Sequence, residues 1–297
     1  MLQRLDTPLA RKATLCLVST SCYTARRLDK RVTTETNERY HADPAAGRFN
    51  KLILPAECLK ELTEIIGEAR TLFYSLTLPW CDEGPRVLPN ANYSKFADAF
   101  RPLQRKFDAA ADKFARAYPD YVEESKKLLN GMWKAEDYPS PAHIRGKFQL
   151  KMQILPFPDS SDFRADLDDD TLADIKAEIE ASSSADTALK NVGERITEVV
   201  GHMAKKLAEY RGKDYQRKPG ETRSFFTDSL VENVRELADL LPAFNLTNDP
   251  KLDEIAERIS KELCVEEAEV LRDNKNVRAS VQKSADEIVA DVQKFFG

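Results

Sequence analysis

The 297-residue sequence has few of the residues from which catalytic and nucleotide-binding sites are usually built. Its three histidines, His41, His143 and His202, are scattered, and no nucleophile and base pair can be assembled from them. It has ten glycines and no G-x-x-x-x-G-K-[ST] motif, so a loop that cradles phosphates is not expected. These absences predict a protein that is not an enzyme and that uses no cofactor.

Cysteine is also scarce, and it is not arranged for metal or disulfide chemistry. The five cysteines are dispersed and include no C-x-x-C pair: Cys16, Cys22, Cys58, Cys81 and Cys264. Neither a zinc site nor a disulfide framework fits this spacing. Free thiols in a reducing compartment are expected, which predicts a cytoplasmic location.

The sequence lacks a long apolar run. No stretch approaches the roughly 20 residues that a membrane-spanning helix requires, so no membrane association is expected. The segment Met1 to Ala25 imitates a targeting peptide only because Arg4, Arg11 and Lys12 precede a short apolar run. Since Ser19 to Ser21 interrupt that run, it is predicted to be a strand and not a signal peptide.

The sequence is rich in charge and in helical periodicity. Charged residues make up 32%, hydrophobic residues 42% and aromatic residues 8%. These proportions favour long solvated helices around a real core. The net charge of -5 and the isoelectric point near 5.5 argue against a globally basic nucleic-acid binder.

The longest periodic stretch runs from Asp166 to Arg217, where apolar residues recur at steps of three and four. It is predicted to be a long helix that packs lengthwise on other helices. His202 lies beside the apolar stripe and is expected to be structural. An acidic run stands near the start: Asp166, Asp168, Asp169, Asp170 and Asp174. Helix capping and solvation explain this run, and a bound divalent cation is the alternative.

Two further helices are predicted on either side of a proline-containing stretch that cannot be helical. Apolar stripes predict helices from Leu59 to Leu76 and from Asn92 to Tyr118, with a kink at Pro102. Another helical piece is predicted from Pro119 to Trp133. Prolines, a glycine and a tryptophan between Leu78 and Asn92 end the first helix. The pair is predicted to be a helical hairpin with a stiff aromatic tip.

Three segments are typical of strands. Lys147 to Ile154 alternates polar and apolar residues, which indicates a strand with one solvated face. Its expected partners are Ala13 to Thr20 and Arg48 to Leu54, because a lone strand leaves its backbone groups unpaired. The intervening segment Arg26 to Tyr40 is predicted to be helical.

Helical stripes continue to the end of the chain. They run from Phe226 to Leu241, closed by Pro242, then from Leu252 to Leu263 after Asp249-Pro250, and from Val277 to Phe295. The fold class is therefore predicted to be mainly α, with long antiparallel helices in a bundle or coiled-coil arm and a small two- to three-stranded β-sheet. Residues 1–165 are predicted to hold the helical hairpin and the sheet, and residues 166–297 the long-helix bundle.

Two basic clusters are candidate nucleic-acid contacts. The first comprises Arg26, Arg27 and Lys30, and the second comprises Lys205, Lys206, Arg211 and Lys213. Basic residues also stabilise a helix C-terminus and favour solubility, so solvation is the competing interpretation. Binding to a phosphate backbone is the functional alternative.

The stiff tip is a candidate protein contact. It carries Trp80, Arg86 and Tyr93, and these three residue types often dominate the energy of protein interfaces. Packing of the tip onto its own hairpin is the competing interpretation.

The first half of the chain resembles a known family. The order is a strand, a basic helix, the segment Gly47 to Pro55, two aromatic helices around a Pro-Trp tip, and an alternating strand. This order is similar to a phage and mobile-element family of unknown function. Members of that family are usually encoded near a MoxR-type AAA+ ATPase and a von Willebrand A-type protein. The resemblance implies a viral or mobile-element origin, and it carries over no catalytic residue.

Two hypotheses for the function follow. The first is a non-enzymatic phage or mobile-element helical scaffold or adaptor in the cytoplasm of a bacterial host cell. Because its apolar stripes exceed what one thin bundle hides, it is expected to form a homo-oligomer or to bind the co-encoded ATPase or von Willebrand A-type protein. The alternative is a DNA-associated accessory protein that uses the basic clusters.

Overall fold

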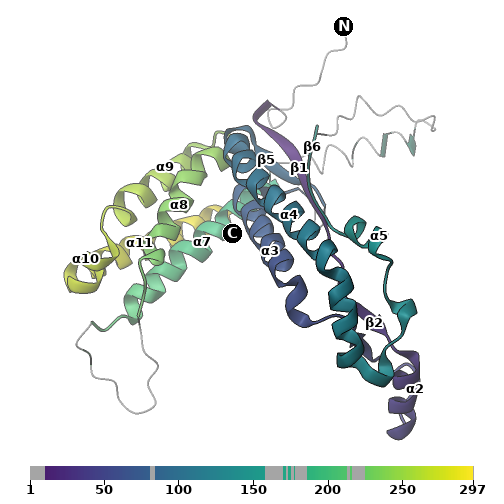
Figure 1. Cartoon of the computed structure of the whole chain (residues 1–297). Helices are drawn as coiled ribbons and strands as arrows, with labels where there is room; N and C mark the ends of the chain where they lie inside the picture. Colours follow the sequence, from purple (N-terminus) through teal and green to yellow (C-terminus); the bar gives the residue numbers. More distant parts are fainter. Residues whose placement is uncertain are drawn as a thin grey trace. The chain divides into compact units, whose positions relative to one another are not determined.

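The computed structural model describes residues 11–80, 84–157, 170–171, 173–174, 177, 186–212, 215 and 225–296 (Figure 1). This part of the chain is mainly helical, with one sheet of four strands and one of two, which confirms the predicted fold class. None of its helices is both long enough and apolar enough to cross a membrane.

The chain divides into two compact units. Unit 1 comprises Met1–Leu17, Leu76–Ser94 and Ile154–Gly297, and unit 2 comprises Val18–Ser75 and Lys95–Gln153. The sequence predicts a single boundary after residue 165, whereas these units interleave segments of the chain. The difference arises because strands far apart in the sequence pair with each other, which a linear pattern does not reveal.

Unit 1 is built on the predicted C-terminal helices. Their bounds are α7 Asp186–Glu209, α8 Ser229–Phe244, α9 Pro250–Arg258, a π-helical turn Ile259–Leu263, α10 Ala268–Asp273 and α11 Lys275–Phe296. α7 packs along α11 and along α8, and α8 packs on α9. The buried core between these helices includes Val192, Ile196, Met203, Leu207, Val234, Leu241, Ile255, Ile288 and Val292.

In unit 1, one helix end differs from the prediction, and part of another predicted helix lies outside the described residues. Pro242 lies inside α8 and does not close it, since the helix continues for two residues to Phe244. The long helix predicted from Asp166 is described as α7, from Asp186 onwards. Of the acidic run, Asp170 and Asp174 are helical and exposed, and the other members lie outside the described residues.

The larger sheet has the strand order β4-β5-β1-β6. Its strands are β1 Ala13–Ser21, β4 Leu78–Pro79, β5 Arg86–Pro89 and β6 Gln149–Leu155. β1 pairs antiparallel with β5, with Ala13 opposite Pro89 and Cys16 opposite Arg86. The segment predicted as an irregular tip therefore supplies two strands. The predicted alternation is confirmed at Phe148, just before β6, and at Leu150, which are buried while Lys151 and Gln153 are exposed. It fails at Ile154, which is predicted on the buried face and is 38% exposed.

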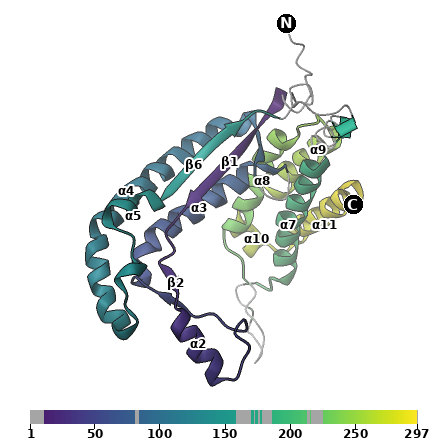
Figure 2. The same ribbon diagram turned by 90° about the vertical axis from the view of Figure 1, so that its right-hand side faces the viewer.

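Unit 2 is organised around α3 Lys60–Leu76 and α4 Asn90–Leu129, which lie side by side in Figures 1 and 2. The two helices are antiparallel, because the rings of Phe73 and Phe96 lie 6.1 Å apart while Glu61 pairs with Lys113. α4 runs for 40 residues through Pro102 and Pro119. The separate helical piece predicted after Pro119 is thus the end of α4.

The continuity of α4 has a physical reason. Each proline removes one backbone hydrogen bond. Large apolar side chains buried along the same helix offset that loss, and they are Phe96, Phe100, Phe107, Phe114 and Tyr118.

A second, two-stranded sheet corrects two expectations about unit 2. β2 Arg26–Leu28 pairs antiparallel with β3 Asn50–Leu52, so β3 does not join the larger sheet. The helix predicted from Arg26 begins at Lys30 as α2 Lys30–Arg39. It begins there because the Asp29 side chain accepts a hydrogen bond from the Val32 amide and caps the helix. The remaining helix, α5, is the short turn Pro141–Ile144.

Candidate functional site

Trp80 lies at the end of β4 and is held in an internal contact. Its ring meets that of Phe157 edge to face, with the centroids 5.0 Å apart, and it packs against the buried core of unit 1. The structure therefore favours packing over a projecting contact. The sequence predicts, as one alternative, packing of the tip on its own hairpin; the partners that the structure shows are Phe157 and the buried core of unit 1.

Arg86 is also engaged within unit 1. Its guanidinium donates to the Thr77 hydroxyl at 2.8 Å and to the Thr77 carbonyl at 3.3 Å. Arg195 donates to the same carbonyl at 2.6 Å, and burial lowers the pKa of Arg195 to about 10, with the charge of Arg86 adding to the shift. Of the three residues predicted at the tip, Tyr93 is the exposed one, at 39%.

The first basic cluster lies on an arm of unit 2 formed by β2, α2, β3 and the loop between α2 and β3 (Figure 2). Arg26 and Arg27 are exposed on β2 and Lys30 is exposed at the start of α2. The Arg27 guanidinium donates to the Asp137 carbonyl at 3.2 Å. The arm also exposes Arg31, Arg39 and Arg48, and the aromatic side chains Tyr40 and Phe49.

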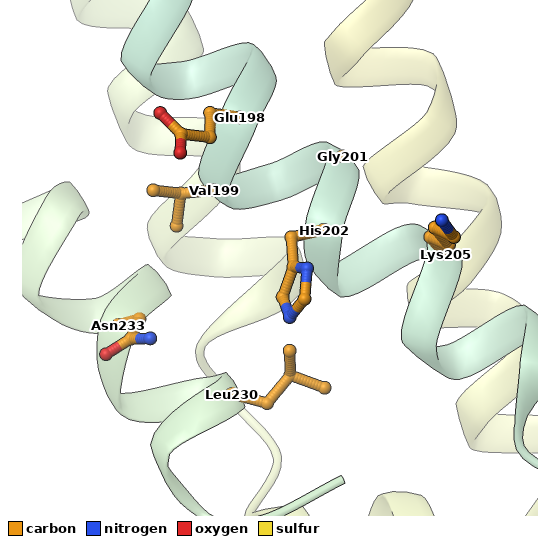
Figure 3. A pocket seen from close by; sticks show the side chains of 7 residues that line it. All are labelled: Glu198, Val199, Gly201, His202, Lys205, Leu230 and Asn233. Carbon is orange, nitrogen blue, oxygen red and sulfur yellow. The ribbon is translucent and has the colours of Figure 1, made fainter. Parts of the chain in front are cut away.

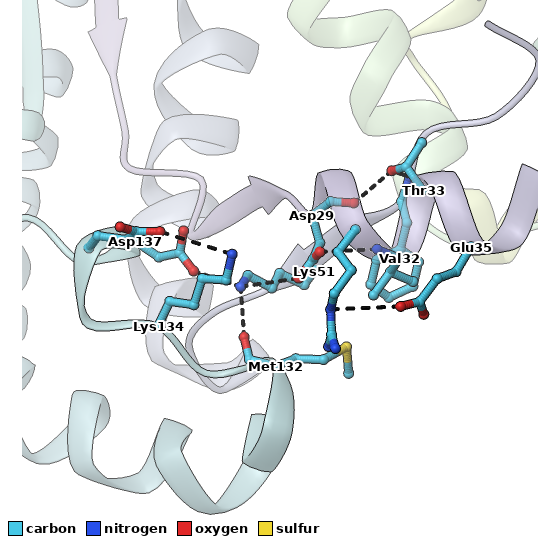
Figure 4. Close-up of polar contacts among 11 residues, drawn as sticks. Asp29, Val32, Thr33, Glu35, Lys51, Met132, Lys134 and Asp137 are labelled. Carbon is cyan, nitrogen blue, oxygen red and sulfur yellow. Dashed lines mark hydrogen bonds and ion pairs between the residues drawn. The ribbon is translucent and has the colours of Figure 1, made fainter. Parts of the chain in front are cut away.

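A buried ion cluster anchors this arm (Figure 4). The Lys51 ammonium on β3 lies 2.6 Å from a carboxylate oxygen of Asp137 and 3.4 Å from one of Asp29, and it donates to the Met132 carbonyl at 2.7 Å. The Lys51 and Asp29 side chains are only 2% and 1% exposed. Because Asp29 also caps α2, one cluster connects the strand, the helix and the segment after α4.

The opposite charges of the cluster stabilise each other's ionised forms. Burial alone would lower the pKa of Lys51, but Asp137 and Asp29 outweigh it and the pKa is raised. The hydrogen bond from the Val32 amide, followed by Lys51, lowers the pKa of Asp29. Both shifts favour the charged forms of Asp29 and Lys51, so the cluster supports the arm as a structural contact.

The second basic cluster lies in unit 1. Lys205 is exposed and Lys206 is half-buried on α7, while Arg211 stacks over the Tyr215 ring at 5.1 Å. Lys213 lies outside the described residues. Of the described members, Lys205 and Lys206 therefore lie on α7, whereas Arg211 follows the end of that helix and is engaged with Tyr215.

Lys205 also lines a pocket of about 420 Å³ between α7 and α8, together with His202 and Glu198 (Figure 3). The His202 ring points toward Leu230 on α8, and Glu198 and Lys205 lie to either side of it. His202 is exposed and not buried in the core as a structural histidine would be. Since the three side chains do not converge on one point, they form no ligand shell. Within the described ranges, no group of three or more His, Cys, Asp or Glu side chains could hold a metal ion.

A groove of about 530 Å³ between α3 and α4 of unit 2 has a different character. Its floor consists of the short or buried side chains Ile65, Ala109 and Ala110. We call its two sides the acidic wall, on α3, and the basic wall, on α4. The acidic wall is Glu61, Glu64 and Glu68, and the basic wall is Lys106, Lys113 and Arg116.

Most charges of this groove have no partner within the described part of the chain. The Lys113 ammonium pairs with Glu61 at 2.8 Å, and both side chains are exposed. Glu64, Glu68, Lys106 and Arg116 make no ion pair or hydrogen bond with any other described side chain. The groove therefore presents charges of both signs that another molecule can pair.

The sequence contains a regular spacing that marks each wall of this groove. The three acids of α3 are spaced three and four residues apart, and the three bases of α4 are spaced seven and three apart. Each set therefore lies on one helix face. That the two faces border one groove depends on the pairing of the helices, which only the structure supplies.

Comparison with known proteins adds no relative, since no family model, no curated protein and no solved structure matches this chain.

Proposed function

We propose that this protein is a non-enzymatic helical adaptor that binds another protein chain in the groove between α3 and α4. The observation that carries the proposal is the pair of charged walls, of which four members are unpartnered among the described residues. A groove between two helices over a floor of small side chains suits a helix of the bound protein.

The dimensions and charges set the strength of such binding. Glu61 and Glu68 span two turns of α3, about 10 Å at 1.5 Å per residue. Each exposed ion pair contributes only about 0.2–1 kcal/mol. The walls therefore determine register and partner choice more than affinity, and apolar contact with the floor supplies the remainder.

Position-specific crosslinking in cells tests the proposal. A photoreactive side chain replaces Ala109, which is exposed on the groove floor, and in a matched control it replaces Ala290, which is exposed on α11. A protein adduct is expected at position 109 and not at 290. No adduct at 109, or equal adducts at both positions, would refute binding in the groove. The co-encoded ATPase and von Willebrand A-type protein implied by the resemblance are the first adducts to look for.

A second function is supported by the arm. Its exposed basic residues include Arg26, Lys30, Arg31, Arg39 and Arg48. Of these five, Arg31 forms an ion pair, with the exposed Glu35 on the same helix at 3.9 Å. Exposed Tyr40 and Phe49 add rings on which bases of a single strand can stack. We therefore propose nucleic-acid binding by the arm as the alternative function.

Binding to single-stranded and duplex DNA over a salt series tests this alternative. Affinity is expected to fall steeply as salt rises, because phosphate contacts release counterions. Arg26→Glu with Lys30→Glu should weaken binding. The matched reversal in unit 1, Lys205→Glu with Lys206→Glu, should leave it unchanged. Absence of binding at low salt, or equal effects of the two reversals, would exclude the arm as the site.

A further inference from the structure

The acidic and basic walls carry opposite charges at corresponding positions along the axis of the groove. Glu68 lies seven residues after Glu61 on α3, and Lys106 lies seven residues before Lys113 on α4. Because the helices are antiparallel and Glu61 pairs with Lys113, Glu68 and Lys106 lie at the same level along the groove. They form no ion pair with each other across it.

We propose that the chain bound at this groove is a second copy of the same protein, related by a twofold axis that runs parallel to α3 and α4. This inference rests on the proposed function of the groove. A rotation about such an axis preserves height and exchanges the two sides. Each acidic wall then faces the basic wall of the other copy, with Glu68 opposite the partner's Lys106.

Repulsion between like charges disfavours the other twofold arrangement of two such faces. A twofold axis perpendicular to the helices, in the plane of the interface, would set acid against acid and base against base. Like charges placed opposite one another weaken association. The observed pattern therefore selects one arrangement. Because the interface is isologous, it closes at two copies and forms no filament.

Charge balance favours a second copy over an unrelated protein. The groove carries three acids and three bases, on separate walls. A face of this kind is complementary to itself. An unrelated partner that is acidic or basic would be repelled by one of the two walls.

Exchange of wall charges tests the inference on the purified full chain. Glu64→Lys with Glu68→Lys gives a face that is basic on both walls, and Lys106→Glu with Arg116→Glu gives one that is acidic on both. All four side chains are exposed, so both variants are expected to keep the fold and the melting temperature of the wild type. A control, Glu236→Lys with Glu287→Lys, makes the same charge change as the first variant, on exposed sites of α8 and α11.

Sedimentation provides the readout. At low salt and about 100 µM, the wild type and the control are expected at twice the 33.6 kDa chain mass. We call the two wall variants single-sign variants, because both walls of each carry one sign of charge. Each of them alone should show a dimer dissociation constant at least about tenfold higher than that of the wild type. An equal mixture of the two variants should restore a dimer that contains one chain of each.

Two results would overturn the inference. One is a wild type that remains monomeric under these conditions, and the other is a dimer that persists in both single-sign variants. Neither result affects the proposed function, which fails if position 109 crosslinks to no protein in cells or if positions 109 and 290 crosslink equally. An adduct with a different protein, together with a monomeric wild type, would keep the adaptor and reject the second copy.

Discussion

Replacement of Lys51 by methionine is expected to destabilise unit 2 strongly. Methionine keeps most of the side-chain volume but removes the cation that lies 2.6 Å from Asp137 and 3.4 Å from Asp29. Removing one member of a buried ion pair typically costs about 3–5 kcal/mol, because the remaining charges stay buried without a partner. Asp137 is 16% exposed and can regain some hydration, so we expect the lower end, about 3 kcal/mol.

The two tryptophans of the chain make this measurable, since Trp80 lies in unit 1 and Trp133 in unit 2. In a Trp80→Phe background, the fluorescence of Trp133 reports urea unfolding of unit 2 alone. Lys134→Met, at an exposed lysine close to the cluster in sequence, is the matched control and should change the free energy of unfolding by less than about 0.5 kcal/mol. A loss below about 1 kcal/mol for Lys51→Met would show that the cluster does not hold the arm.

The same cluster predicts how the stability of unit 2 depends on pH. The pKa of Asp29 is lowered on folding, so its contribution is present above its unfolded pKa and is lost as the pH falls through the folded pKa. The pKa of Lys51 is raised, so its contribution is present below its unfolded pKa and is lost as the pH rises through the folded one. Between these limits the contribution should stay constant, and Lys51→Met should abolish the loss on the alkaline side.

Three further predictions concern packing and reactivity. Trp80→Ala should lower the stability of unit 1 by about 2 kcal/mol, because its ring is half-buried, and should leave the mass in solution unchanged. In thermal melts, Gly67→Ala should stabilise by about 0.5–1 kcal/mol, since a Cβ there meets open space. Gly193→Ala should instead destabilise by about 1 kcal/mol, because a Cβ there would lie 2.6 Å from the Phe296 ring. Burial raises the pKa of Cys16 to about 12, so in thiol labelling at pH 8 this cysteine should react only after unfolding. Equal labelling of Cys16 and the half-buried cysteines, or equal effects of the two glycine changes, would contradict these assignments.

The helices could be predicted from the sequence because their stability depends on local periodicity. The apolar stripe of α7, with Val192, Ile196 and Met203, is buried as predicted. The cap at Asp249 and the first-turn Pro250 of α9 are also confirmed. These features involve residues a few positions apart, which a sequence displays directly.

Strand pairing and the candidate site could not be predicted in the same way. β5 joins β1 across some seventy residues of chain, and nothing within Arg86–Pro89 specifies that partner. The sequence leaves open whether Trp80 packs internally or forms a protein contact, because it does not show Phe157 beside it. The charged groove likewise required the pairing of α3 with α4, although each wall has its own regular spacing.

Carboxylate footprinting can show whether another protein chain occupies the charged groove between α3 and α4. The reactivity of Glu64 and Glu68 with a carbodiimide is compared with that of Glu236 and Glu287, which are exposed on α8 and α11. As the purified protein is concentrated from about 0.1 to about 100 µM, the two groove carboxylates should become protected while the two controls stay reactive. Equal reactivity of all four carboxylates at every concentration, with no protection when cell extract is added, would contradict occupation of the groove.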